Sequence, residues 1–163
     1  MDHPRMSLKH RYTVSDFLFY ICLLAVPLIT AVIAIINISA WWTMAFIGFG
    51  AGCGVIILKF YCTRCPHYTR NEKNLKCIFF WGFPKFFDKR PGKLELSDKL
   101  ITYGATTALL IFPLYWLLMA PGLLIVYILS LIGLGAAICR SECHRCIYFE
   151  CPANRASEVL KNS

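Results

Sequence analysis

Four long runs of apolar residues dominate the chain, separated by short turns or by longer polar stretches. The runs lie at 17–36, 42–60, 100–118 and 122–138. A helix of about 20 apolar residues crosses the hydrocarbon core of a bilayer, and no charged residue lies in the interior of any run. The pattern predicts an all-α membrane protein with four transmembrane helices, arranged as two hairpins in a single membrane domain over 1–163.

Two cysteine-rich polar stretches, 61–99 and 139–163, follow the second and fourth runs. The chain is 58% hydrophobic and its mean hydropathy is +0.57, which is too apolar for an ordinary soluble domain. A soluble helical bundle would need polar helix faces turned towards water, and these runs have none. The composition therefore excludes a soluble bundle.

The basic residues are distributed unevenly along the chain. All 17 Lys and Arg residues fall in the N-terminal segment, in 59–99 or after residue 139. The turns at 38–40 and 119–121 contain none. Because Lys and Arg concentrate in cytoplasmic loops, we predict a multi-pass protein of the cell membrane with both termini and the central loop in the cytoplasm. Attraction to anionic lipid explains the net charge of +8 without a nucleic acid partner.

Local signals mark helix starts and helix packing. Thr13 and Asp16 fit a capping box ahead of the first run, and Ser97 and Asp98 are candidates to cap the third. Alternating glycines in the second run form overlapping GxxxG patterns, namely Gly48, Gly50, Gly52 and Gly54. Glycine at this spacing lets helices approach closely in lipid, so we expect these residues to hold the bundle together.

The middles of the spans lack ionisable side chains. No Asp, Glu, Lys, Arg or His lies there, although proton relays, ion-coupled transporters and voltage sensors generally need such residues. A haem held by two histidines between helices is excluded for the same reason. We therefore interpret the bundle as a scaffold and place the chemistry on the cytoplasmic face.

That face carries two copies of Cys-x-Arg-Cys, at 62–65 and 143–146. Seven of the nine cysteines lie in the cytoplasmic stretches, where thiols stay reduced and bind metals more often than they form disulfides. Two cysteines separated by two residues can place both sulfurs on one ion. We predict one metal site with the ligands Cys62, Cys65, Cys143 and Cys146. Further candidate ligands are Cys77, Cys139 and Cys151.

The identity of the metal is less constrained than its ligands. Zinc is favoured, with iron or an iron–sulfur cluster as the alternative, because Cys-Pro steps such as Cys65-Pro66 also occur in ferredoxin-type ligand runs. Cys22 and Cys53 lie inside spans and are expected to be small packing residues.

The two halves of the chain have the same plan, which suggests an internal duplication. Each half has two apolar runs followed by Cys-x-Arg-Cys and a third cysteine, Cys77 or Cys151. A pseudo-twofold axis normal to the membrane would bring the two motifs together at a shared site. The arginines would then offset the negative charge of the thiolates, or would simply mark the cytoplasmic side.

An aromatic segment at 78–87 follows the first motif. Six aromatic side chains beside lysine suit the headgroup region of a bilayer. We expect an amphipathic or re-entrant segment lying on the membrane, and a quinone or partner dock is the alternative.

The cysteine strings resemble those of a group of small four-helix membrane proteins from anaerobic microbes that has no assigned activity. The resemblance rests on Cys62-x2-Cys65-Pro66-His67-Tyr68 with Cys77, on Trp81-Gly82-x-Pro84-Lys85-x-Phe87, and on Cys143-x2-Cys146-x4-Cys151-Pro152-x-Asn154. It covers about a third of the chain, and the insert 69–76 before Cys77 departs from the pattern. It implies a membrane location and a cysteine-bound centre, but no reaction.

Two functions of different classes fit these features. The first is a non-enzymatic scaffold whose cytoplasmic face is tied by zinc and anchors a membrane or cytoplasmic protein. The second is an electron carrier that passes electrons from iron to quinone or to a partner subunit. Thiol–disulfide exchange is less favoured, because the working cysteines of such membrane enzymes face the oxidising side. A soft-metal transporter would need cysteines or histidines along its spans, where only Cys22 and Cys53 occur.

Overall fold

The computed structural model describes residues 12–69, 74–90, 92 and 94–147. Its helices and strands occur in the order α1 (Val14–Ile36), α2 (Ala40–Phe60), a 3-10 turn (Cys62–Arg64), α3 (Pro66–Thr69), β1 (Asn74–Lys76), β2 (Trp81–Pro84), α4 (Leu96–Ile111), α5 (Leu114–Leu118), α6 (Pro121–Ala137) and a π-helical turn (Ile138–Glu142). Four helical segments of this part of the chain are long and apolar enough to cross a membrane: Val14–Ile36, Ala40–Arg64, Leu96–Leu118 and Pro121–Glu142. They confirm the prediction of a mostly helical, multi-pass membrane protein.

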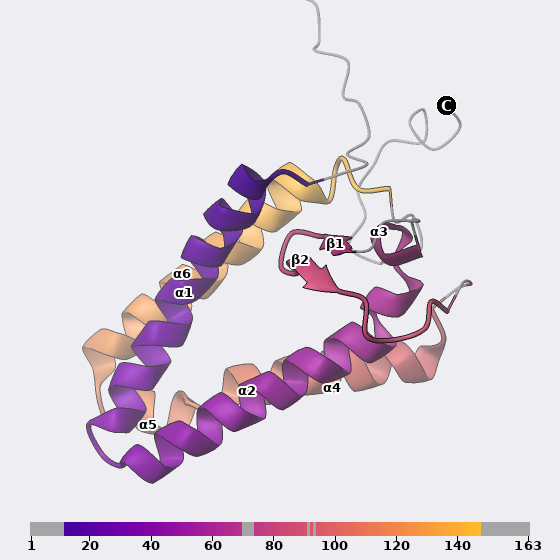
Figure 1. Cartoon of the computed structure of the whole chain (residues 1–163). Helices are drawn as coiled ribbons and strands as arrows, with labels where there is room; N and C mark the ends of the chain where they lie inside the picture. The colour runs from indigo at the N-terminus through magenta and orange to yellow at the C-terminus, as the bar shows by residue number, and fades with distance from the viewer. Residues whose placement is uncertain (1–11, 70–73, 91, 93, 148–163) are drawn as a thin grey trace, which may run out of the picture.

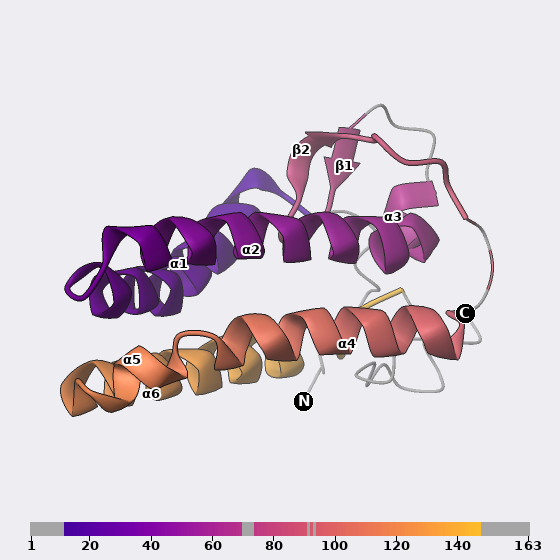
Figure 2. The same ribbon diagram turned by 90° about the horizontal axis from the view of Figure 1, so that it is seen from below.

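The long helices form two arms that diverge from a common end (Figure 1). Helix α1 packs chiefly against α6, and α2 packs chiefly against α4. Viewed from below, α1 and α2 lie in one layer and α4, α5 and α6 in the other (Figure 2). We call the end where the arms meet, at residues 37–39 and 119–120, the turn end. The opposite end carries both Cys-x-Arg-Cys motifs, and we call it the cysteine end.

The starts of α1 and α4 are stabilised differently. The predicted capping box of α1 is present, since the Asp16 amide donates to Thr13 Oγ1 at 3.2 Å and the Thr13 amide donates to Asp16 Oδ2 at 2.9 Å. The predicted cap of α4 is wrong, because Glu95 is the N-cap residue and provides no side-chain cap. Asp98 is buried and pairs with Arg64 instead.

The core of the bundle lies near the turn end. Its buried members are Ala31, Ala34, Ile35, Phe46, Trp116, Leu117 and Tyr127. The small alanines of α1 allow close packing against α5, whose Leu117 is fully buried. The chain breaks between α4 and α5 at Pro113, because proline cannot continue the hydrogen bonding of a helix interior. This break lets aromatic rings stack across α2, α4 and α5, with Phe112 and Trp116 centroids 5.4 Å apart.

The predicted role of the glycine pattern is only partly supported. Gly50 of α2 faces α4, where its Cβ position lies 3.6 Å from Leu109 Cδ1. The Cβ positions of Gly48, Gly52 and Gly54 have no atom of a neighbouring helix within 4 Å among the described residues. Three of the four glycines therefore make no close helix packing within the described part of the chain.

A small hairpin of β1 and β2 lies between the arms at the cysteine end (Figure 1). We call residues 74–87, which contain it, the hairpin module. Strands β1 and β2 pair antiparallel, so the aromatic segment contributes a strand where we had expected an amphipathic or re-entrant segment. The module is built on a second core of Leu58, Cys62, Tyr68 and Leu75. The Tyr68 hydroxyl donates to the Phe87 carbonyl at 2.6 Å and accepts from the Phe87 amide at 3.0 Å. These bonds fix the strand segment to the chain that follows the first cysteine motif.

Candidate functional site at the cysteine end

The first motif continues directly from α2. A 3-10 turn places Cys62 in the second core. Cys77 and Cys65 lie close enough to its thiol for their charges to act on it. Cys65 is half-buried, and its Sγ lies 3.5 Å from Nδ1 of the buried His67. The motif therefore brings thiols and an imidazole together at the end of α2. Both are donor types that zinc accepts.

Arg64 of this motif forms a buried ion pair with the start of α4. Its Nε lies 2.7 Å from Asp98 Oδ2 and its Nη2 lies 2.8 Å from Glu95 Oε1. The side chains of Arg64 and Asp98 are 7% and 4% exposed. Gly92 passes close by with φ +133°, a conformation that L-residues rarely adopt. The charge of Arg64 is thus paired inside the protein with Asp98 and Glu95.

The second motif follows a π-helical turn that extends α6. Such turns are rare and widen a helix locally. Glu142, the last residue of the turn, is buried, and its Oε1 accepts a hydrogen bond from the Tyr20 hydroxyl at 3.1 Å. Cys143 is buried directly after it, whereas Cys146 is half-buried. The turn therefore ties the second motif to α1.

Tyr12 joins the two motifs. It is buried just before α1, its ring centroid lies 5.3 Å from that of His67, and its hydroxyl bonds to Glu142. Its carbonyl accepts a hydrogen bond from Trp81 Nε1 at 3.3 Å. One side chain thus contacts a residue that follows the first motif and a residue that precedes the second. Its position holds the hairpin module against the start of α1.

The environment of this site favours protonated side chains. Burial is the main cause that raises the pKa of the Tyr12 phenol, and the negative charges of Glu142 and Cys146 add to it. Burial also raises the pKa of the Cys77 thiol, although the backbone amides of Phe79, Ile78 and Phe80 act in the opposite direction. Metal binding would have to displace the Cys77 proton, because thiols bind metals as thiolates.

The structure gathers the predicted ligands at one end but does not assemble them. The eight described cysteines are in the reduced, thiol form. Cys62 lies near Cys77 and Cys65, and Cys146 lies near Tyr12. Cys139 is exposed, and Cys151 lies outside the described residues. Within the described part of the chain, no group of three or more His, Cys, Asp or Glu side chains is placed to hold a metal ion.

Sequence reasoning missed three members of the site: Tyr12, His67 and Glu142. Tyr12 and Glu142 are separated by 130 residues, so no local pattern could pair them. His67 stands two residues after Cys65, and this spacing was the one available signal.

We predict that Tyr20→Phe destabilises the protein by about 1.5 to 3 kcal/mol, the range for hydrogen bonds to charged groups. The reason is that Glu142, at 8% exposure, loses a donor that water cannot easily replace. Thermal unfolding in detergent, followed by circular dichroism, measures the change. Tyr115→Phe is the matched control, since Tyr115 is 64% exposed. Equal unfolding midpoints for the two variants would contradict the prediction.

Comparison with protein-family models, curated proteins and solved structures gave no match.

Proposed function

We propose that this protein is a non-enzymatic membrane scaffold whose cytoplasmic face binds zinc through the cysteines of its two motifs. The observation that carries the proposal is the position of Tyr12, which contacts His67 beside the first motif and Glu142 beside the second. Both motifs therefore belong to one region, although 81 residues separate Cys62 from Cys143.

The donor chemistry supports a soft or borderline metal. Thiolate and imidazole are the ligands of structural zinc sites, and Cys65 and His67 already lie in contact. A complete site requires the thiols of Cys143 and Cys146 to come closer to those of the first motif than they do in the described residues. The ion would supply the energy for this movement, since zinc binding in small modules is coupled to folding.

A scaffold role follows from the spans. Their interiors hold no Asp, Glu, Lys, Arg or His, the residues that proton and ion pathways generally use. The exposed Phe83 and Phe86 of the hairpin module flank Lys85. Aromatic rings beside a basic group suit either the headgroup region or a protein partner. An electron carrier with iron at the same thiols is the competing function.

Orientation is the first test. The basic residues among the described residues lie in the segments of the cysteine end and are missing from the turns at 38–40 and 119–121, which supports a cytoplasmic cysteine end. In a cysteine-free background, cysteines introduced at Ser39 and Ala120 are expected to react with a membrane-impermeant maleimide added to intact cells. A cysteine introduced at Lys85 is expected to react only after the cells are opened. The reverse labelling pattern would place the site outside the cell.

Metal content is the second test. Zinc bound at about one ion per purified chain is the expected result. Iron in its place, with visible absorption, would support the electron carrier.

A further inference from the structure

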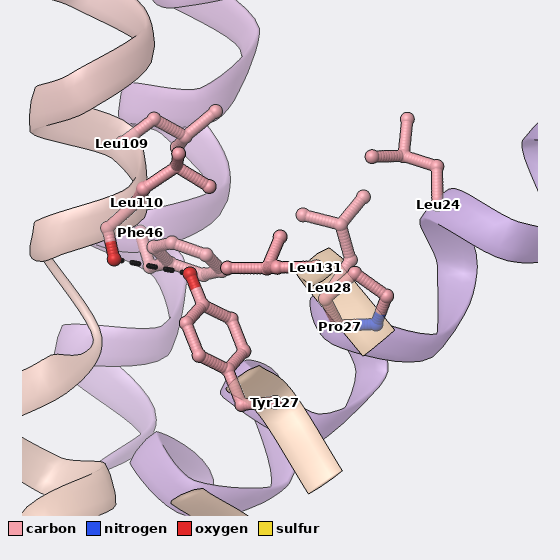
Figure 3. A pocket seen from close by; sticks show the side chains of 8 residues that line it. All are labelled: Leu24, Pro27, Leu28, Phe46, Leu109, Leu110, Tyr127 and Leu131. Carbon is pink, nitrogen blue, oxygen red and sulfur yellow. Dashed lines mark hydrogen bonds between the residues drawn. The ribbon is translucent and has the colours of Figure 1, made fainter. Parts of the chain in front are cut away.

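A cavity lies between the two arms and is lined by all four spans. It contains about 320 Å³ of space, part of it open to the surroundings. Its lining residues are Leu24, Pro27 and Leu28 of α1, Phe46 of α2, Leu109 and Leu110 of α4, and Tyr127 and Leu131 of α6 (Figure 3). Seven of these eight side chains are apolar. The cavity is separate from the cysteine end and from the chemistry assigned there.

The cavity offers too few partners for a buried water. Its one polar side chain, Tyr127, donates its hydroxyl to the Leu110 carbonyl at 3.0 Å (Figure 3). A buried water needs two to four polar partners, and cavities lined only by apolar groups stay dry or take apolar molecules. An occupant of this space is therefore apolar.

The depth of the cavity indicates which apolar molecule can reach it. Pro27 lies 13 residues after Val14, the first residue of α1, which places it about 20 Å along the helix. That position is inside the hydrocarbon core of a bilayer about 30 Å thick. Leu28 and Leu110 are 39% and 38% exposed, so the cavity opens towards that core. Lipid acyl chains surround the opening.

The lining also matches the spacing of the internal duplication that the sequence suggests. Pro27 and Leu109 are 82 residues apart, as are Leu28 and Leu110, and Phe46 and Tyr127 are 81 apart. The starts of α1 and α4 are likewise 82 residues apart, and the cysteine motifs 81. Residues separated by the spacing of the suggested repeat thus line the same cavity. This places the cavity where the two halves meet.

We propose that this cavity binds one acyl chain of a bilayer phospholipid. The acyl chain fills the space between the arms where they begin to diverge. It supplies the dispersion contacts that the lining side chains would lack if the cavity were empty. Recognition is by shape and apolarity alone, since the lining offers no free polar group among the described residues. The proposal is independent of metal binding at the cysteine end.

Retention of phospholipid by the purified protein tests the proposal. Wild-type protein is reconstituted in nanodiscs of phosphatidylethanolamine and phosphatidylglycerol, released into a mild detergent and counted for bound lipid by native mass spectrometry. One phospholipid per chain is expected. Leu28→Trp fills the opening and is expected to lower occupancy about tenfold, which corresponds to about 1.4 kcal/mol. Ile29→Trp is the matched control, because Ile29 is the next residue on α1, is 57% exposed and does not line the cavity.

Equal retention by Leu28→Trp and Ile29→Trp would overturn the proposal, as would wild-type protein without phospholipid or with a free fatty acid or quinone in its place. A second measurement uses wild-type protein alone and so does not depend on the folding of a variant. A phospholipid with a photoreactive acyl tail is expected to label Phe46 and Tyr127. Both are 4% exposed, and an acyl chain reaches them through the cavity. Labelling confined to outward residues such as Ile29 would contradict binding.

Discussion

Replacing Arg64 with alanine is expected to destabilise the protein by about 3 to 5 kcal/mol, the cost of removing one partner from a buried ion pair. The Asp98 side chain, 4% exposed, would lose its closest partner. The cation left beside it among the described residues, Arg90, lies 3.8 Å away and is 45% exposed. This contact is too long and too solvated to compensate for the loss. Because Arg64 and Asp98 join the end of α2 to the start of α4, the loss should open the cysteine end first.

The free energy of unfolding in mixed micelles, titrated with a denaturing detergent and followed by circular dichroism, measures this effect. Arg90→Ala is the control and is expected to cost less than about 1 kcal/mol, as exposed pairs do. The double variant Arg64→Met, Asp98→Leu removes both charges and should recover most of the stability. Equal losses for Arg64→Ala and Arg90→Ala would show that the buried pair contributes little.

The double variant Cys62→Ala, Cys143→Ala is expected to lose bound zinc and the stability that zinc confers. One thiolate is removed from each motif, and two ligands cannot complete a tetrahedral site. Structural zinc in small modules contributes on the order of 10 to 16 kcal/mol at neutral pH. The expected loss is therefore large and concentrated at the cysteine end.

Zinc content by elemental analysis and protection of the loop amides from hydrogen exchange both report on this variant. Cys53→Ala is the control, because Cys53 is buried inside a span and its Sγ donates to the Ala105 carbonyl at 3.5 Å. It should keep the zinc of the wild type. Stoichiometric zinc in the double cysteine variant would exclude the predicted ligands.

The helical part of the fold was predictable because its determinants are local or compositional. Long apolar runs define the spans regardless of their neighbours. The capping box at Thr13 and Asp16 is contained within four residues. Each of these signals is complete within one stretch of sequence.

The arrangement of the cysteine end was not predictable, because its contacts join distant parts of the chain. The sequence suggested Asp98 as a helix cap, whereas in the fold it pairs with Arg64, which follows α2. The strand at Trp81–Pro84 depends on pairing with Asn74–Lys76 and on the bonds of Tyr68 to Phe87. The GxxxG pattern has the right spacing for packing, yet only Gly50 meets another helix closely among the described residues. Spacing indicates what a residue can do, whereas the fold determines which partner it meets.

Anaerobic purification of the full chain, followed by elemental analysis and an absorption spectrum of the same sample, tests the central claim most directly. A metal-bound scaffold predicts colourless protein with about one zinc per chain, since zinc has no redox chemistry and no visible absorption. A brown sample that bleaches with dithionite and contains more iron than zinc would contradict the scaffold and identify an electron carrier.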